Sequence, residues 1–293
     1  MRNLFIFEGP DYTGKSYALR ETAKYFKELF GVKNVKLFKF PNYTGEGLDL
    51  SEKNPYLLKN GQLAAGKILY DMLHDRKYDL IKKTYKEKKY DFNNPTTFVN
   101  FHYLQLLDKE QTTDYLLSCC DTYKLVLCDR FIDSQIVYAS VFYEMSDRFY
   151  NITESDEYKL TIEKLNNLFK EKSAYIGFSR TRSNHLFQLI KRIEPKDDRD
   201  NNTIDTLGDT FHNLINNAYE KRYLLKKEPI FIVDQNQKLF DYLFNEYNNG
   251  NIFDERMREP YYFFDEAIRI KRILEKTSSI GDITDFIKRI GEF

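Results

Sequence analysis

The fold is decided at residues 4–16, which read Leu4-Phe5-Ile6-Phe7-Glu8-Gly9-Pro10-Asp11-Tyr12-Thr13-Gly14-Lys15-Ser16. The first four of these residues form a short apolar run, as in a buried strand. The run leads into the pattern G-x-x-x-x-G-K-S, in which a glycine-containing loop directs backbone N–H groups at an anion and then opens a helix. Residues 17–26 continue at helical spacing. This stretch therefore predicts a strand, a phosphate-binding loop and a helix, rather than an ordinary Gly-containing turn.

Two side chains of this loop have direct chemical roles. Lys15 is expected to neutralise the β- and γ-phosphates of a nucleotide, and the Ser16 hydroxyl is expected to bind Mg²⁺. The pattern by itself indicates only that a nucleotide binds, so the rest of the chain has to indicate the reaction.

Composition narrows the class of protein and of partner. The chain has 293 residues, enough for one α/β domain with insertions or for two small domains. Lys plus Arg and Asp plus Glu number 45 each, so the formal net charge is zero. A neutral total does not favour nucleic acid or an anionic membrane as the main partner, and any anion site has to be local.

Cysteine usage and hydropathy predict a soluble, cytoplasmic protein. The three cysteines are Cys119, Cys120 and Cys128, an odd number without metal-ligand spacing, which favours a reducing compartment. No apolar run approaches the roughly 18 residues of a membrane span, and the sequence enters a strand at once, without a signal peptide. The 23 Tyr and 24 Phe without any Trp, beside many Asn, Lys and Ile, indicate an AT-rich genome such as that of a virus or phage. The cytoplasm would then be that of the host.

A strand–helix–strand order over the first forty residues predicts a parallel sheet. Residues 35–40 alternate as a second strand, and Pro41 ends it. Such a βαβ unit places helices on both faces of the sheet. Further strands are expected at 123–128, 174–178 and 229–234. The predicted class is a three-layer α/β fold with about five parallel strands between helices.

Helical periodicity accounts for most of the remaining chain, and one charged stretch suits a lid. Helices are expected at 61–89, 94–117, 134–172 with a polar break at 146–156, 184–193, 211–225 and from 237 onward. The run Lys82 to Lys89 is expected to be a solvated helix face rather than a binding patch.

Residues 194–200 form a hydrophilic, Pro-interrupted stretch after a basic helix end. This suits a mobile lid that closes over phosphates, although a solvated charged loop has the same composition.

Asp129 and Arg130 are a second group of candidate site residues. They follow the third core strand at its carboxyl end, where ligands bind in open α/β sheets. Polar residues at a strand end can equally be caps. The first and third strands commonly end side by side in such folds, which would bring this pair next to the phosphate-binding loop.

Taken in order, these features resemble the thymidylate kinase family of P-loop nucleoside monophosphate kinases. Residues 5–16 are similar to the family pattern F-E-G-x-D-x-x-G-K-[ST]. Phe40-Pro41 is similar to the F-P or E-P element of the family, and Asp129-Arg130-Phe131 with Ser134 is similar to its D-R-[YH]-x-x-S motif. Residues 231–234 are similar to its closing strand. The order holds over residues 1–245, with insertions near 45–64, 75–95 and 141–172. We therefore expect a kinase domain at residues 1–249 and a C-terminal helical extension at 250–293.

The resemblance implies an ATP-dependent kinase that converts a deoxynucleoside monophosphate, dTMP or dUMP, to the diphosphate, with ATP and Mg²⁺ as cofactors. It also implies a homodimer, while the composition argues against nucleic acid and membrane as partners. The implied ATP-binding residues are Gly9, Tyr12, Thr13, Gly14, Lys15 and Ser16, and the implied metal ligands are Ser16 and Asp129. The implied substrate-binding residues are Asp11, Phe40, Tyr43, Phe101, Gln105, Lys109, Arg130 and Ser134. The implied catalytic residues are Lys15, Asp11, Arg130, Arg192 and Arg199.

The resemblance also assigns roles. Asp11 would meet the sugar hydroxyl of the monophosphate or a water on Mg²⁺, and Arg130 would meet the acceptor or transferred phosphate. Members of the family carry the catalytic Arg either in the loop or in the lid. Because the loop here has no Arg, Arg192 and Arg199, in or beside the lid, are the expected source of that charge.

The sequence departs from the family pattern at two places. An Arg that grips the acceptor phosphate normally follows the F-P element, and the residues here are Asn42-Tyr43-Thr44. On the helix expected to hold the base, the stacking aromatic would be Phe101, and the edge contact is left open between Gln105 and Lys109. The base is left open between thymine and uracil, because a pocket discriminates one methyl group by only ~1–3 kcal/mol.

Two other functions stay open. A deoxynucleoside kinase acting on thymidine shares the fold but needs a general base, typically Glu, after the second strand, and Phe40-Pro41 occupies that place. A nucleotide-binding module without phosphoryl transfer would explain Tyr12 and Tyr43 as signs of lost acceptor chemistry.

Overall fold

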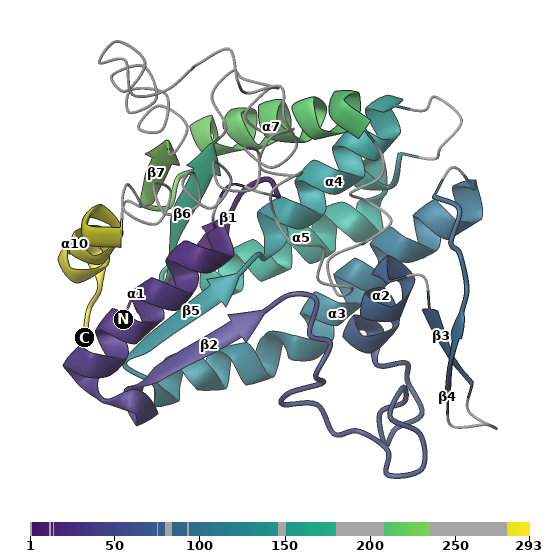
Figure 1. Cartoon of the computed structure of the whole chain (residues 1–293), viewed down its shortest axis with the longest axis horizontal. Helices are drawn as coiled ribbons and strands as arrows, with labels where there is room; N and C mark the ends of the chain where they lie inside the picture. The colour runs from purple at the N-terminus through teal and green to yellow at the C-terminus, as the bar shows by residue number, and fades with distance from the viewer. Residues whose placement is uncertain are drawn as a thin grey trace, which may run out of the picture.

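The computed structural model describes residues 2–11, 13, 15–74, 76–79, 84–92, 94–145, 151–179, 208–234 and 280–293. Within these ranges the chain forms an α/β fold with helices on both faces of a central sheet (Figure 1). The predicted lid, its arginines Arg192 and Arg199, and residues 235–279 lie outside the described ranges.

The central sheet that these residues form has five strands, all parallel, in the order β2-β5-β1-β6-β7. The bounds are β1 Leu4–Glu8, β2 Val35–Lys39, β5 Leu125–Asp129, β6 Ser173–Ser179 and β7 Ile230–Asp234. Counted along the chain within this sheet, the order is 2-3-1-4-5. The predicted α/β class with a five-stranded parallel sheet is confirmed.

The register of β1 and β5 determines where the site forms. Phe7 pairs with Asp129 across the two strands, so the loops that follow β1 and β5 leave the sheet next to each other. Both strands are buried along their whole length, which explains why they are apolar almost to their ends. Glu8 and Asp129, the last residues of the two strands, introduce the first charges at the carboxyl edge.

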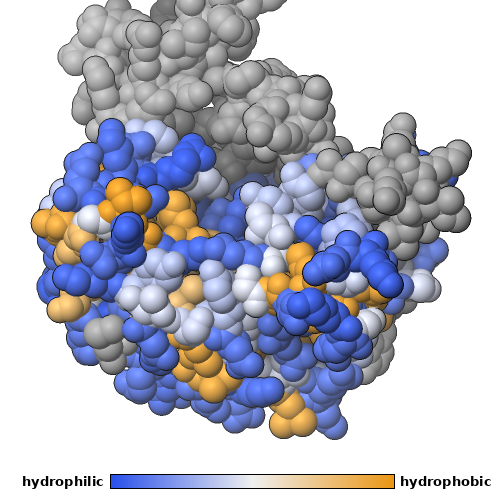
Figure 2. Space-filling model, turned by 90° about the horizontal axis from the view of Figure 1, so that it is seen from below, coloured by the Kyte–Doolittle hydropathy of each residue, from blue (hydrophilic) through white to orange (hydrophobic). Residues whose placement is uncertain are grey.

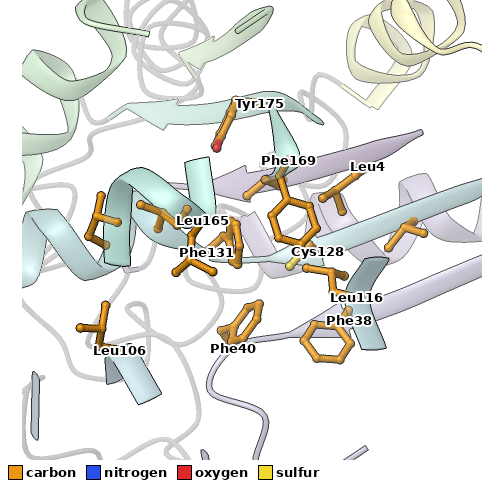
Figure 3. Packing of buried hydrophobic residues seen from close by; sticks show 14 of the residues in the cluster. Leu4, Phe38, Phe40, Leu106, Leu116, Cys128, Phe131, Leu165, Phe169 and Tyr175 are labelled. Carbon is orange, nitrogen blue, oxygen red and sulfur yellow. The ribbon is translucent and has the colours of Figure 1, made fainter. Parts of the chain in front are cut away.

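Helices cover both faces of the sheet because successive strand residues point to opposite sides. Phe5 and Phe7 pack with α1 (Lys15–Phe30) and α10 (Ile280–Ile290) on one face. Leu4 and Ile6 pack on the other face with α3 (Pro95–Thr122), α4 (Ile132–Met145) and α5 (Asp156–Phe169). Figure 3 shows this second core, in which the Phe131 and Phe169 rings meet edge to face. A third cluster joins α3 and α4 to α2 (Ala65–Leu73) and α7 (Gly208–Leu224).

Several predicted helices are confirmed with shifted ends. The Asn94 side chain caps α3 by accepting hydrogen bonds from the backbone N–H groups of Thr96 at 2.9 Å and Thr97 at 3.4 Å. The helix ends at Thr122 rather than at residue 117. The predicted polar break separates α4 from α5, and its described residues include the 3-10 turn η2, Ile152–Glu154. A second described 3-10 turn, η1 Val32–Asn34, precedes β2.

The prediction of one helix over 61–89 is wrong in its second half. The helix α2 ends at Leu73, and two antiparallel strands follow, β3 Arg76–Asp79 and β4 Thr84–Glu87. Within the run Lys82 to Lys89, residues 84–87 are therefore a strand and not the predicted helix face. The register sets Tyr78 opposite Tyr85, and tyrosine favours strands, which accounts for the departure from the helix prediction.

The last helix returns to the start of the chain. Ile283, Phe286 and Ile287 of α10 are buried on the α1 face of the sheet. The backbone N–H of Glu292 donates a hydrogen bond to the carbonyl of Arg2 at 3.0 Å. The described end of the predicted C-terminal extension thus packs in the same core as the sheet.

The surface seen from below is largely hydrophilic, with separate hydrophobic patches (Figure 2). Across the part of the chain that the structure describes, no helix is both long enough and apolar enough to cross a membrane. The three cysteines are free and buried.

Candidate active site

The phosphate-binding loop leaves β1 at Gly9, where only glycine fits. Its φ is 154°, and a Cβ at this position would lie 2.7 Å from the Cβ of Phe178. The Thr13 hydroxyl donates a hydrogen bond to the carbonyl of Pro10 at 2.9 Å. Helix α1 then begins at Lys15, as the pattern predicts. The other two predicted loop residues, Tyr12 and Gly14, lie outside the described residues.

The first ion pair of the candidate site is Lys15 with Asp129. The Lys15 ammonium donates a hydrogen bond to the Asp129 carboxylate, and both side chains are buried. Burial lowers the pKa of Lys15, and the neighbouring carboxylate offsets part of that effect. Burial by itself would raise the pKa of Asp129, but the nearby positive charges of Lys15, Lys39 and Arg130 together outweigh burial and hold that pKa below its ordinary value. The loop lysine and the strand-end carboxylate therefore meet as a charged pair.

The second pair is Asp11 with Arg130. One terminal nitrogen of the guanidinium donates to Asp11, and the other donates to the Gly9 carbonyl at 3.1 Å and the Ser134 hydroxyl at 3.2 Å. The Tyr138 hydroxyl donates to the second Asp11 oxygen at 2.6 Å. Burial by itself would raise the pKa of Asp11, but the Arg130 charge, the Tyr138 hydrogen bond and the Lys15 charge together outweigh burial and lower that pKa to about 2.

Arg130 holds its position with a strained backbone. Its φ is 67°, in the left-handed region that residues other than glycine rarely adopt. Such strain persists only where the surrounding contacts over-determine the conformation, and it is concentrated at functional sites. The hydrogen bonds of the guanidinium to Gly9, Asp11 and Ser134 provide such contacts.

Glu8, the last residue of β1, is a buried carboxylate that links the two motifs. One oxygen accepts hydrogen bonds from the backbone N–H groups of Phe131 at 2.6 Å and Ser134 at 3.3 Å, and the other accepts from the Ser134 hydroxyl at 2.5 Å. Burial and the charge of Asp133 raise the pKa of Glu8. Sequence reasoning did not single out Glu8 as a site residue. A charge that closes an otherwise apolar strand is the signal that could have found it.

The two residues after the second strand that are predicted to bind the acceptor nucleotide, Phe40 and Tyr43, differ in exposure. Phe40 is buried, and its ring packs on that of Phe131 with centroids 5.2 Å apart. Tyr43 is 41% exposed and stacks on Tyr70 with centroids 4.7 Å apart. Of the two residues, Tyr43 presents the larger surface to a ligand.

Two of the three predicted base contacts on α3 are engaged by other side chains of the same region. Phe101 is buried and packs edge to face against Phe92, with ring centroids 5.1 Å apart. The side-chain oxygen of Gln105 lies 3.0 Å from Nδ1 of His102. Phe101 is therefore covered by its neighbours, whereas the Gln105 side chain is half-buried.

Lys109, the third predicted base contact, lies beside Phe40, which is predicted to bind the acceptor nucleotide. Its buried ammonium donates to the carbonyl of Gln105 and to the side chain of Gln135, each at 3.3 Å. It also lies 5.3 Å from the centroid of the Phe40 ring. Burial lowers the pKa of Lys109, and the Asp108 carboxylate acts against that shift.

A cleft of about 290 Å³ opens beside the loop and the end of β5. Its lining includes Ser16, Asp129, Lys39, Arg20 and Tyr43. A hydroxyl and a carboxylate are hard oxygen donors of the kind that Mg²⁺ prefers, and the two cations suit phosphate oxygens. No three His, Cys, Asp or Glu side chains among the described residues group as metal ligands, but Mg²⁺ is usually held by one or two carboxylates together with substrate phosphates. These residues therefore fit a magnesium-bound nucleotide.

Sequence reasoning missed two tyrosines of the site. Tyr138 from α4 contacts Asp11, and Tyr219 from α7 contacts Arg130. Both are buried among apolar residues at helical spacing, so their sequence pattern is that of core residues. No local signal shows that their hydroxyl groups face the ion pair.

The strand order and the phosphate-binding loop define a P-loop α/β fold. No protein-family model matches the sequence, and no curated protein sequence shows a significant match. The structure is similar to those of thymidylate kinases. That from Ehrlichia chaffeensis is 16% identical with a TM-score of 0.40, and the match covers 79% of this chain and 88% of that one. That from Candida albicans is 15% identical with a TM-score of 0.45, and the match covers 86% and 96%. At these identities the similarity concerns the fold alone.

Proposed function

We propose that this chain is an ATP-dependent deoxynucleoside monophosphate kinase with dTMP or dUMP as the acceptor. One observation carries the proposal. The residues of the loop and of the strand end meet in two ion pairs, Lys15 with Asp129 and Asp11 with Arg130. The pairs are close enough that Lys15 and Arg130 both lower the pKa of Asp129. Nucleotide binding alone needs the first pair, whereas the second adds a cation suited to another phosphate.

Phosphoryl transfer requires positioning and charge neutralisation more than covalent work by the protein. In this proposal Lys15 neutralises the donor phosphates, Arg130 holds the acceptor phosphate, and Asp11 orients Arg130. When bound, ATP supplies the transferred group and Mg²⁺ neutralises its phosphates, with Ser16 and Asp129 as the residues that would hold the metal. Phosphates bound beside Lys15 would neutralise its positive charge, and the Asp129 carboxylate would then be available to hold Mg²⁺.

The remaining parts of the proposal rest on the sequence. Arg192 and Arg199 are proposed to add positive charge from the lid side, and the chain is proposed to act as a homodimer in the cytoplasm. The three free, buried cysteines support a reducing compartment.

An assay that couples ADP release to a detectable product tests the reaction with dTMP, dUMP, thymidine and dGMP as acceptors. We expect dTMP or dUMP to accelerate ATP turnover, and Lys15→Ala to abolish it. Lys172→Ala is the matched control, because Lys172 forms a more exposed ion pair with Asp121. That variant should keep the wild-type rate.

The same assay separates the two alternatives. If thymidine alone accelerates turnover, the chain is a deoxynucleoside kinase, although the buried Phe40 stands where that class needs a carboxylate. If no acceptor accelerates turnover while Lys15→Ala abolishes nucleotide binding, the kinase proposal fails and the chain is a nucleotide-binding module.

A further inference from the structure

Tyr219 of α7 reaches the centre of the Arg130 site. Its side chain is fully buried. The hydroxyl oxygen lies 3.0 Å from a terminal nitrogen of Arg130, 2.7 Å from the Ser134 hydroxyl and 3.3 Å from the Glu8 carboxylate. One tyrosine therefore contacts the strand that precedes the loop and two residues of the Asp129–Ser134 motif.

The chemistry of the donors and acceptors gives these hydrogen bonds a direction. A guanidinium has only N–H donors, so Tyr219 accepts from Arg130. Ser134 donates its own proton to Glu8, which leaves the Ser134 oxygen free to accept from Tyr219. Burial raises the pKa of Tyr219 well above its ordinary value, so the hydroxyl keeps its proton. A chain of hydrogen bonds thus runs from the Arg130 cation through Tyr219 and Ser134 to Glu8.

We propose that Tyr219 is a positioning residue that orients the Arg130 guanidinium toward the acceptor phosphate, an inference that rests on the kinase function proposed above. Asp11 holds one terminal nitrogen of the guanidinium, and Tyr219, Ser134 and the Gly9 carbonyl hold the other. The backbone of Arg130 is strained, so its side-chain contacts have to keep it in place. Loss of one acceptor lets the guanidinium shift, and a misplacement of about 1 Å can cost ~10²-fold in rate.

Tyr223, one turn further along α7, is a matched control. It is also buried, but its hydroxyl bonds to backbone carbonyls, that of Glu8 at 2.9 Å and that of Phe178 at 3.0 Å. This hydroxyl ties α7 to the sheet. Tyr219→Phe and Tyr223→Phe each remove one buried hydroxyl and keep the ring.

Steady-state kinetics distinguish positioning from packing. We expect Tyr219→Phe to lower kcat/KM for dTMP by ~10- to 100-fold while the KM for ATP changes by less than about 2-fold. Because each variant loses one buried hydroxyl, Tyr223→Phe and Tyr219→Phe should lower the melting temperature by similar amounts. Tyr223→Phe, however, should keep kcat/KM within about 2-fold of wild type. A Tyr219→Phe enzyme with wild-type kcat/KM overturns the inference.

A second measurement does not depend on the reaction. In protein labelled with ¹⁵N-arginine, the Nε–Hε resonance of Arg130, assigned through Arg130→Lys, should move in Tyr219→Phe and stay in place in Tyr223→Phe. Ser134→Ala removes a direct partner of the Arg130 guanidinium as well as the partner of Tyr219, so it should also move the resonance and shows that the resonance reports on these contacts. If the resonance stays in place in Tyr219→Phe, the positioning role is refuted, even where the wild type phosphorylates dTMP. If the wild type phosphorylates no monophosphate and the resonance still moves, the kinase proposal fails while the control of Arg130 by Tyr219 stands.

Discussion

The ammonium of Lys15 and the carboxylate of Asp129 form an ion pair in which both side chains are buried. Burial makes this pair costly to break, because removing one partner leaves a buried charge without a counter-charge, typically at ~3–5 kcal/mol. We expect Asp129→Asn to lower the free energy of unfolding by about that amount, measured by urea denaturation.

Two variants serve as controls for this prediction. Asp121→Asn removes the carboxylate of a more exposed pair with Lys172 and should cost ~1 kcal/mol or less. The double variant Lys15→Met/Asp129→Leu removes both buried charges and should be less destabilised than Asp129→Asn. Equal losses for Asp129→Asn and Asp121→Asn would show that the first pair is not buried in solution.

Asp108 should make stability fall as pH rises. One carboxylate oxygen accepts from the Asn42 backbone N–H at 3.1 Å, and the other, buried, has no hydrogen-bond partner among the described residues. Burial raises the pKa of Asp108 to about 6 despite the neighbouring Lys109 charge. The unfolded chain releases this proton near pH ~4, so between pH ~4 and ~6 the folded state binds more protons and loses stability as pH rises. A shift of one pKa unit corresponds to about 1.4 kcal/mol, so raising the pH through this range lowers the free energy of unfolding by about 3 kcal/mol.

The variant Asp108→Asn removes this titration. We expect it to match the wild type near pH ~4 and to be more stable by ~2–3 kcal/mol near pH ~7, as measured by urea denaturation at both values. A stability difference that is the same at both pH values would contradict the raised pKa of Asp108.

The part of the site that could be predicted is the part that local rules govern. Gly9 and Lys15 lie in one contiguous pattern, and Asp129 and Arg130 follow one apolar strand, so neighbouring residues carry the information. The expectation that the first and third strands end side by side then joins the two motifs, and the pairing of β1 with β5 confirms it.

The part that could not be predicted depends on packing between distant segments. Tyr219 contacts Arg130 across 89 positions of sequence, and only the packing of α7 on α4 brings it there. Phe101 shows the helical spacing that a core residue and a base-stacking residue share, and only its burial separates them. In residues 76–79 and 84–87 the lysines favour helix locally, whereas pairing between the two strands is what the structure shows.

Phe286 should contribute strongly to stability, because α10 completes the core on the α1 face. Its ring meets Phe5 edge to face with centroids 6.3 Å apart and stacks on Phe231 at 5.6 Å. We expect Phe286→Ala to lower the free energy of unfolding by ~3–5 kcal/mol in thermal or urea denaturation. The control is Leu160→Ala, at a side chain 65% exposed on α5, which should change it by no more than ~0.5 kcal/mol. A comparable effect of the two variants would mean that α10 is not docked.

Arg192 and Arg199 provide the test of the predicted lid. The catalytic charge is expected from one of them, because the loop carries no Arg. Charge-stabilising arginines supply several kcal/mol to phosphoryl transfer, so we expect Arg192→Ala or Arg199→Ala to lower kcat by at least ~10² in the ADP-release assay. Arg289→Ala, at an exposed position of α10, is the control and should keep the wild-type kcat. If both lid variants keep it too, the catalytic charge comes from another part of the chain.

Gly9 should tolerate no side chain, whereas Gly281 should accept one. A Cβ at Gly9 would lie 2.7 Å from the Cβ and 2.8 Å from the carbonyl oxygen of Phe178, which cannot rotate away, and its φ of 154° disfavours other residues. We expect Gly9→Ala to lower the free energy of unfolding by ~1–3 kcal/mol and to weaken ATP binding, because the start of the phosphate-binding loop has to move. A Cβ at Gly281, in the first turn of α10, meets no described atom within 4 Å, so Gly281→Ala should leave ATP binding unchanged and stabilise the fold by ~0.5–1 kcal/mol. Denaturation and ATP titration of both variants provide the measurement, and wild-type ATP affinity in Gly9→Ala would show that the loop does not bind phosphate in the way proposed.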